Sequence, residues 1–438
     1  TKRSWEKVAA FVLLSATMGT ALLPSKAEAA PQQARKADDF VDSIGICTKV
    51  GYFDSDSAGW DNVRSKVSEL GVRFYREGLE HVDNPTRKSR LQGLYDSYGM
   101  KMLALCGPYG NDNLQPQNGN LNHIPPKVAG IKPFLYAVEG PNEPDLFWHD
   151  PWNYGGYTNR VDQVVWYQNT LYNAIKNYSA TSDVPVTSFA TAYGEYSSNF
   201  VGKPFSHDMV AWHHYNNPWK PNPWQLSYER GNYNSNKPGI LTEHGYNVNK
   251  VSQKAQGKYN ARSAAYFFDW NNNVKTFFYV LGPDGEDYGL LNSNWTPRPA
   301  FNALKSVISY VKEGTWNTST KTWNKPNFTP GSLDFNITGD TADVWWRLLQ
   351  KSNGEFYLLI WNNSDSYTTT GSDIDSSRNI TISFPQSRKV VQYRGNDSGV
   401  YTETTLTNGA TSLGVNVPDS LMILKITNGG AVSGAPIG

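Results

Sequence analysis

Residues 134–144 read FLYAVEGPNEP and residues 239–246 read GILTEHGY, and in each stretch an apolar run of strand length leads to a glutamate. Short continuous apolar runs are typical of strands in parallel sheets, because helices cover both faces of such sheets. These two runs span residues 134–139 and 239–242. Six similar runs occur elsewhere, at residues 41–47, 72–76, 101–106, 184–190, 209–214 and 274–281.

Helical patterns occupy most of the intervals between the eight runs. In residues 62–70, Val63, Val67 and Leu70 recur at helix spacing, and Gly71 is a suitable stop. The same period recurs in residues 87–98, 161–178, 261–271 and 299–311, whereas the intervals after the third and fifth runs show no clear helix. This alternation predicts a (β/α)8 TIM barrel, an α/β fold, over residues 38–315.

The sequence changes character after residue 325. Strand-like runs are separated there by turns rich in Gly, Asn, Asp and Ser, at residues 332–336, 342–349, 356–361, 379–384, 390–393 and 420–426. No helical period occurs among them, so residues 325–428 are predicted to form a C-terminal antiparallel β-sandwich domain. We expect residues 429–438 to be a flexible tail.

The first 29 residues have the pattern of a secretory signal peptide. Three basic residues lie among the first seven, a mostly apolar stretch follows, and residues 27–29 read AEA, which fits the small-x-small cleavage pattern. The apolar stretch is short and contains polar residues, which disfavours a membrane span. We therefore expect a secreted, extracellular protein with no membrane segment.

Composition and charge argue against several classes of partner. The 40 basic and 39 acidic side chains leave a net charge of +1, so no strong field attracts nucleic acid or a membrane surface. Aromatic residues make up 13% of the chain, and flat rings suit the C–H faces of sugars. Cys47 and Cys106 fall on predicted strands that are not neighbours, so we expect free thiols rather than a disulfide.

Glu143 and Glu243 stand where a (β/α)8 barrel carries its catalytic groups, just past the fourth and seventh strands. A lone glutamate after a strand is usually a solvated loop residue. Two carboxylates facing each other across a barrel mouth are instead the groups that glycoside hydrolysis requires. A separation of about 5–5.5 Å would make one of them a nucleophile and the other an acid and then a base. The pair therefore predicts a retaining glycoside hydrolase.

The two stretches also resemble glycoside hydrolase clan A, the retaining (β/α)8-barrel glycosidases that include cellulase-like and β-xylosidase-like families. In that clan the Asn-Glu pair after strand four carries the acid/base, which would be Glu143 preceded by Asn142. The glutamate that ends strand seven is the nucleophile, which would be Glu243. Arg76 matches the arginine at the end of the clan's second strand. Residues 287–291 and 297–301 resemble the last crossover of several clan families, so the resemblance spans residues 41–313.

Two further positions follow the clan's His-x-Tyr pattern at the end of strand six, His213 and Tyr215. The resemblance implies that Arg76 and Tyr215 keep the nucleophile ionised and that Asn142 binds the sugar 2-hydroxyl. His213 would position the acid/base or a sugar hydroxyl. Many clan families carry a Trp in strand eight beneath the reactive sugar, whereas this chain offers Tyr279.

Aromatic side chains in the loops at the same end of the barrel are candidates for sugar stacking. Trp148 after strand four and Trp219 after strand six represent them, although packing within the loops would explain such rings equally well. His149 and Asp150 show no metal-ligand spacing with their neighbours, so we expect no metal and no other cofactor.

Three functions remain open at this stage. The sequence favours a monomeric, extracellular, endo-acting hydrolase of β-linked polysaccharide or oligosaccharide, because long aromatic loops suggest a cleft for several sugar units. An exo-acting β-glycosidase similar to β-xylosidases would use the same two glutamates. A catalytically silent carbohydrate-binding protein would not need both, so the presence of Glu143 and Glu243 argues against it.

Overall fold

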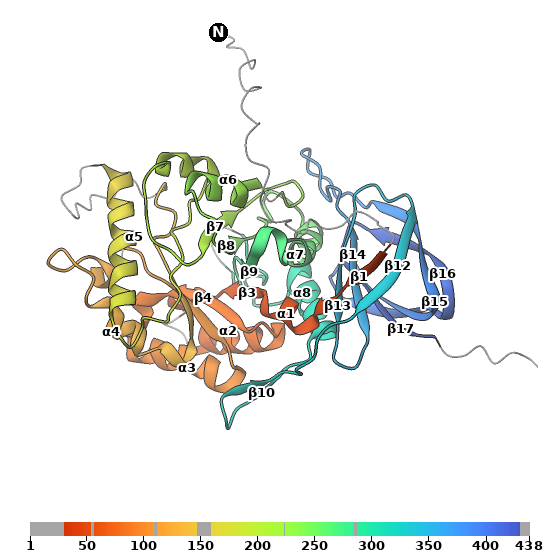
Figure 1. Cartoon of the computed structure of the whole chain (residues 1–438), viewed down its shortest axis with the longest axis horizontal. Helices are drawn as coiled ribbons and strands as arrows, with labels where there is room; N and C mark the ends of the chain where they lie inside the picture. Colours follow the sequence, from red (N-terminus) through yellow and green to blue (C-terminus); the bar gives the residue numbers. More distant parts are fainter. Residues whose placement is uncertain are drawn as a thin grey trace, which may run out of the picture.

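The computed structural model of the chain describes residues 30–53, 57–108, 112–146, 159–222, 224–283 and 287–429. The predicted signal peptide and residues 430–438 of the predicted tail lie outside this part. The described chain forms a barrel of strands and helices with a β-rich domain beside it (Figure 1). Among the described residues, no helix is long and apolar enough to cross a membrane.

Seven parallel strands form the barrel sheet in the order β6-β5-β4-β3-β9-β8-β7. Their bounds are β3 Ile44–Cys47, β4 Phe74–Gly78, β5 Lys101–Leu105, β6 Leu135–Glu139, β7 Val210–His214, β8 Gly239–His244 and β9 Asn273–Phe278. Residues 184–190, the predicted fifth strand, close the ring through isolated parallel bridges. Val186 pairs with Val138 of β6, and Thr187 pairs with Met209 just before β7. The predicted (β/α)8 barrel is confirmed.

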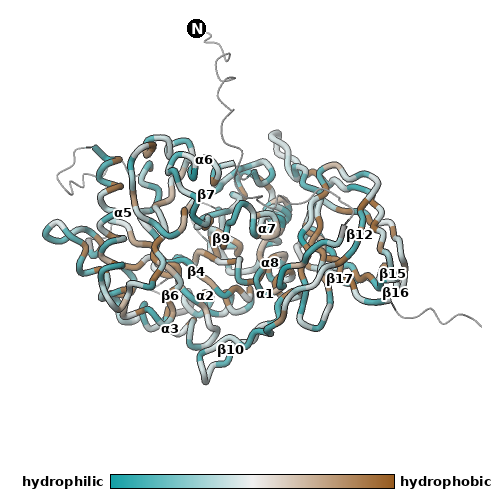
Figure 2. Tube along the Cα trace, viewed as in Figure 1, coloured by the Kyte–Doolittle hydropathy of each residue, from teal (hydrophilic) through white to brown (hydrophobic). Residues whose placement is uncertain are grey.

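Helices surround this sheet. Their bounds are α1 Ala37–Asp42, α2 Ser57–Leu70, α3 Pro85–Tyr98, α4 Ile124–Ala129, α5 Arg160–Asn177, α6 Trp224–Asn232, α7 Gln253–Phe267 and α8 Pro299–Val311. Hydrophilic and hydrophobic residues alternate along the outer helices, as α5 shows (Figure 2). In α3 the Asn84 side chain caps the first turn by accepting from the Thr86 and Arg87 amides, and Gly99 ends the helix at a φ of 67°.

Several boundaries differ from the sequence prediction by a few residues, and for two of them the structure shows the physical reason. Val41 was assigned to the first strand but lies in α1, because the helix continues to Asp42 and the Ser43 amide bonds back to the Phe40 carbonyl. The helix predicted over residues 261–271 is α7, which begins eight residues earlier, at Gln253. Its first two turns bury polar side chains, and this hides the helical period in the sequence.

The second domain is an antiparallel sheet that folds over itself. Its strands are β12 Ser332–Gly339, β13 Val344–Gln350, β14 Phe356–Asn362, β15 Ser377–Gly395, β16 Tyr401–Pro418 and β17 Met422–Asn428. The first half of β15 pairs with β12 and the second half pairs with β17. Side chains from both halves, such as Phe335, Leu358 and Leu424, share one core. The predicted β-sandwich is confirmed, although β16, an edge strand rich in Thr, was not predicted.

The chain enters this second domain twice. Strand β1 (Ala30–Gln33) pairs with β12, and β2 (Arg35–Lys36) pairs with β13. Figure 1 shows β1, in dark red, among the blue C-terminal strands. The sequence prediction had begun the sandwich at residue 325, because six residues are too few to show a strand pattern. Between the predicted barrel and the predicted sandwich, β10 (Thr315–Asn317) and β11 (Thr322–Asn324) form a hairpin.

Helix α7 joins the barrel to the sandwich. The buried Nη1 of Arg262 donates to three carbonyl oxygens of the second domain, those of Asn362 at 3.0 Å, Ser364 at 2.8 Å and Asp419 at 2.8 Å. The apolar outer face of β14, including Leu359 and Trp361, belongs to the same core as the barrel helices. The sandwich therefore buries both of its faces at this point.

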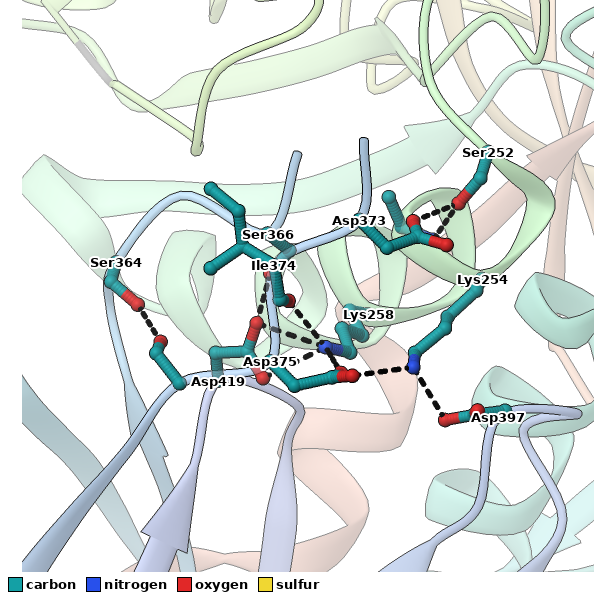
Figure 3. A network of polar contacts seen from close by, with 12 residues as sticks. Ser252, Lys254, Lys258, Ser364, Ser366, Asp373, Ile374, Asp375, Asp397 and Asp419 are labelled. Atoms are coloured by element: carbon teal, nitrogen blue, oxygen red, sulfur yellow. Dashed lines mark hydrogen bonds and ion pairs between the residues drawn. The ribbon is translucent and has the colours of Figure 1, made fainter. Parts of the chain in front are cut away.

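A polar network continues the same contact toward the surface (Figure 3). Lys258 of α7 lies 2.6 Å from an Asp375 oxygen and 2.9 Å from an Asp419 oxygen, and Lys254 pairs with Asp375 and Asp397. The pairs that involve the exposed Asp375 and Asp397 contribute little individually, whereas Asp419 is buried and bonds Lys258 away from solvent. Their main effect is to fix which face of the sandwich meets α7.

Candidate active site

Arg76, the central residue of β4, organises the polar centre of the barrel mouth. Its guanidinium is almost fully buried and donates to three side chains. Nη1 lies 2.6 Å from Oε1 of Glu243, and Nη2 lies 2.7 Å from Oδ1 of Asn142. Nε and Nη2 also bond the two oxygens of Glu139, at 2.6 and 3.1 Å. Glu139 is the last residue of β6 and is fully buried. Its carboxylate fixes the position of the Arg76 guanidinium, which also donates to the carboxylate of Glu243.

Glu243 is positioned by β8 and held as a carboxylate. The Tyr215 hydroxyl donates to its Oε2 at 2.7 Å, while Arg76 donates to Oε1. Burial alone would raise the pKa of Glu243. The positive charges of His213 and Arg76, together with these hydrogen bonds, outweigh burial and hold that pKa below its usual value. Glu243 is therefore ionised at neutral pH, as a nucleophile must be.

Glu143 lies in a loop with unusual backbone geometry. Its φ is +42°, in the left-handed region that side-chain-bearing residues rarely adopt, and its amide donates to the Ala190 carbonyl at 2.8 Å. This backbone directs Oε1 to within 2.7 Å of His213 Nδ1. Burial would lower the pKa of His213, but the negative charges of Glu243 and Glu143 raise it to about 9. His213 is then a cation that donates from Nδ1 to Glu143.

The two glutamates lie close together. One carboxylate oxygen of each and one ring nitrogen of His213 all fall within 4.8 Å of one another. Inverting glycosidases keep their carboxyl groups about 6.5–9.5 Å apart, whereas retaining enzymes keep them about 5–5.5 Å apart. This separation matches the retaining arrangement.

The same three side chains could serve as ligands for a metal ion. However, His213 Nδ1 and Glu143 Oε1 already bond each other, and both Glu243 oxygens accept hydrogen bonds from protein groups. A cation would have to displace these bonds. The arrangement is better suited to holding and moving a proton.

A cleft of 860 Å³ opens above this centre. Tyr279, Tyr215 and Tyr288 form one wall with their rings edge to face, and Lys49 Nζ lies 4.5 Å from the centre of the Tyr279 ring. Leu146, Ala192 and Tyr193 line the cleft next to Glu143, to which they are linked by backbone bonds and through Asp145. Glu77, Glu80, His81 and Arg87, from β4 and the segment after it, also line the cleft, so its lining extends well beyond the two glutamates.

Seven of the nine predicted site residues meet at the cleft or directly behind it: Arg76, Asn142, Glu143, His213, Tyr215, Glu243 and Tyr279. Trp219 does not line it, and its ring is half exposed in the turn after β7. Trp148 lies outside the described residues. The sequence prediction missed Glu139, Lys49, Tyr193 and Tyr288. Glu139 had a usable signal, since a charged residue inside a buried strand requires a partner.

Solved glycoside hydrolases share this architecture. A family 39 glycoside hydrolase from the gut symbiont Bacteroides cellulosilyticus WH2 matches at a TM-score of 0.56 with 17% identity, over 89% of this chain and 82% of that one. A GH30 endoxylanase from Clostridium papyrosolvens C71 matches at 0.53 with 13% identity, over 92% and 99%. A monomeric β-xylosidase from Caulobacter crescentus CB15 matches at 0.54 with 12% identity, over 91% and 98%.

The chain has the fold of clan A glycoside hydrolases. Families 39 and 30 belong to that clan, so the resemblance expected from the sequence is confirmed at the level of the fold. No family model and no curated protein matches the sequence. The identities are too low to transfer an activity, and the function has to be argued from the site itself.

Proposed function

We propose that this chain is a retaining glycoside hydrolase that cleaves β-linked polysaccharide or oligosaccharide by double displacement. The observation that carries the proposal is the short separation of Glu143 and Glu243, within 4.8 Å, with Glu243 held ionised by Arg76 and Tyr215. Glu77 and Glu80 also line the cleft beside His81, but both belong to one chain segment at the end of β4, whereas Glu143 and Glu243 follow two separate strands.

The first step joins Glu243 to the sugar. A Glu243 oxygen attacks the anomeric carbon as the glycosidic C–O bond breaks, and Glu143 transfers a proton to the departing oxygen. His213 resupplies or shares that proton through the 2.7 Å bond from Nδ1. In the second step Glu143 removes a proton from water, which attacks the anomeric carbon and releases Glu243. The sugar leaves with its original anomeric configuration.

Asn142 is oriented for substrate by Arg76. Because its Oδ1 accepts from the guanidinium, its amide N–H groups are the ones that point away from Arg76. They are suited to the 2-hydroxyl of the reacting sugar, whose hydrogen bonds strengthen in the transition state.

We further propose endo action by a secreted enzyme. The cleft measures 860 Å³ and is lined by side chains from several loops besides the two glutamates, which suits a chain of several sugar units. The similar structures are described as both an endoxylanase and a β-xylosidase, so exo action on a β-glycoside is the second candidate.

The test is a screen of the purified chain against neutral β-linked polysaccharides and aryl β-glycosides, with sizing of the products and NMR of the first anomer released. We expect NMR to show the β-anomer as the first product and sizing to show a series of oligosaccharides of different lengths. Release of single sugars alone would favour exo action, and α-anomer first would contradict the retaining assignment. Absence of turnover on every substrate would favour a carbohydrate-binding protein.

A further inference from the structure

Four large aromatic side chains lie exposed on one surface next to the cleft: Tyr193, Tyr196, Trp224 and Tyr228. Between 41% and 54% of each is exposed. The first two come from the 3-10 helix η5 (Gly194–Phe200) and the residue before it, and the other two come from α6. We call this set the aromatic track.

The rings of the track are in mutual contact. The ring centres of Tyr193 and Tyr196 lie 6.0 Å apart, and those of Trp224 and Tyr228 lie 5.8 Å apart. Gly194 connects the two pairs, because a Cβ there would lie only 3.1 Å from Cη2 of Trp224. The indole therefore rests against the backbone between the two tyrosines.

Buried polar bonds fix η5 on α6 beneath the rings. Thr191 Oγ1 and Gln225 Nε2 both donate to Oε1 of the fully buried Glu229, at 3.0 and 2.9 Å. Asn232 Nδ2 donates to Ser197 Oγ at 2.6 Å. The exposed rings are therefore attached to a rigid backbone. Tyrosine and tryptophan side chains also lose little conformational entropy when a ligand binds to them.

The track is continuous with the cleft on the Glu143 side. Tyr193 itself lines the cleft, and its amide donates to Oδ2 of Asp145, two residues after Glu143. Asp145 Oδ1 accepts from the Ala192 amide at 2.9 Å. Since Glu143 is the proposed donor to the departing oxygen, the track lies on the side where the leaving group must sit.

The chemistry of the track suits a neutral sugar chain. Its exposed neighbours Ser198, Asn199 and Ser227 are uncharged hydrogen-bonding groups, and Glu195 is the single exposed charge within η5. Rings that can stack on the C–H faces of sugars, interspersed with hydroxyl and amide groups, match a polymer with alternating apolar faces and hydroxyls. Among the described residues, η5 and the first six residues of α6 contain no Lys or Arg that would attract a polyanionic chain.

We infer that the aromatic track binds the leaving-group side of a neutral, β-linked glycan chain, several sugar units beyond the bond that is cleaved. The assignment of the track to the leaving-group side rests on the proposed function. The inference that the track binds a glycan does not depend on it. The track would make the enzyme act on polymers and long oligosaccharides in preference to small glycosides.

Binding is tested in a Glu243→Gln background, so that the polymer is not degraded. Affinity electrophoresis in gels containing xylan, mixed-linkage β-glucan or mannan compares this protein with versions that also carry Tyr193→Ala, Trp224→Ala or both. We expect retardation by at least one of these polymers, with about tenfold weaker binding for each ring removed. Tyr178→Ala removes an equally exposed ring from the end of α5 and should leave retardation unchanged.

Kinetics on otherwise wild-type protein give the second measurement. A Trp224→Ala/Tyr228→Ala variant, whose two rings are not among the residues that line the cleft, should lose kcat/KM on the polymer and keep that on an aryl β-glycoside within about twofold, with unchanged thermal unfolding. The inference would be overturned if the track variants were retarded as strongly as the parent protein. It would also be overturned if Tyr178→Ala reduced the retardation as much as the track variants do. Sedimentation showing that the two substitutions abolish self-association while glycan binding persists would overturn it as well. Absence of turnover on all glycosides would instead overturn the proposed function, and the gel measurement would still decide on the track.

Discussion

The hydrogen bond from Tyr215 to Glu243 offers a direct test of how the nucleophile is kept ionised. Tyr215→Phe removes one hydroxyl, which lies 2.7 Å from Oε2 of Glu243, and leaves the Arg76 bond to Oε1 in place. A buried hydrogen bond to a charged group contributes roughly 1.5–3 kcal/mol. Since one pKa unit corresponds to about 1.4 kcal/mol, the pKa of Glu243 should rise by about 1–2 units.

The sign of the pH effect follows from which form is active. Glu243 must be a carboxylate to attack, and its pKa is lowered in the folded protein, so the acidic limb of the kcat/KM profile should lie below the usual range of a glutamate. In Tyr215→Phe this limb should move to higher pH. Glu243, His213 and Glu143 influence one another's titration. The apparent pKa read from the acidic limb therefore describes these three groups together rather than Glu243 alone.

Stability gives an independent measurement of the same shift. A carboxyl group whose pKa is lowered by folding stabilises the protein above its unfolded pKa, and this contribution disappears as the pH falls through the folded pKa. Tyr215→Phe should therefore destabilise the protein at pH 7 and cost progressively less below pH ~4.

The assay is kcat/KM on an activated aryl β-glycoside across the pH range, with denaturant unfolding at neutral and acid pH. Tyr246→Phe is the matched control, because its buried hydroxyl has no hydrogen-bond partner among the described residues. The reasoning is refuted if the acidic limb of Tyr215→Phe stays in place, or if Tyr246→Phe moves it equally.

Five further outcomes are expected. Glu243→Ala should abolish nearly all turnover without unfolding the protein, and azide should restore some activity with an α-linked product by NMR; normal turnover would refute the nucleophile assignment. Glu143→Gln should slow natural glycans by about 10²–10⁴-fold while dinitrophenyl glycosides still complete the first step, and equal loss on both would exclude it as the acid. Dialysis against a chelator should leave kcat unchanged, because the carboxylates already share hydrogen bonds with protein groups. Arg262→Met should cost about 2–4 kcal/mol in unfolding measurements, because three buried carbonyls lose their donor, whereas Lys254→Met should cost less than about 1 kcal/mol. Truncation after residue 325 should lower the melting temperature or solubility by exposing the apolar barrel surface that β14 covers, and an equally stable barrel would make the sandwich dispensable.

Much of the site was predictable because a barrel fixes where strand ends go. Once eight apolar runs are recognised, Arg76, Glu143 and Glu243 must project into one mouth although the two glutamates are 100 residues apart in the chain. Their chemistry then limits the function to few classes. Tyr279 followed from the same rule applied to the eighth strand.

The missed features share a different physical origin. Glu139 was overlooked because a strand-final charge looks like the beginning of a loop; the sequence signalled that it needs a partner, and the structure identifies that partner as Arg76. Strands β1 and β2 are stabilised by partners some 300 residues away, so their own sequence carries little strand signal. Tyr193 becomes part of a surface only when η5 packs on α6.

The charges around the two glutamates also explain why the acid/base can serve both steps. Before reaction the negative charge of Glu243 is the main attraction that raises the pKa of His213 to about 9, so the proton resides on the His213–Glu143 pair across a 2.7 Å bond. When Glu243 becomes esterified in the proposed first step, that negative charge disappears. The attraction holding the proton then weakens in the same step in which the leaving oxygen needs it. The pair is left without the proton, and Glu143 can accept one from water. When Glu243 is released as a carboxylate, the attraction returns and the proton is retained for the next cycle.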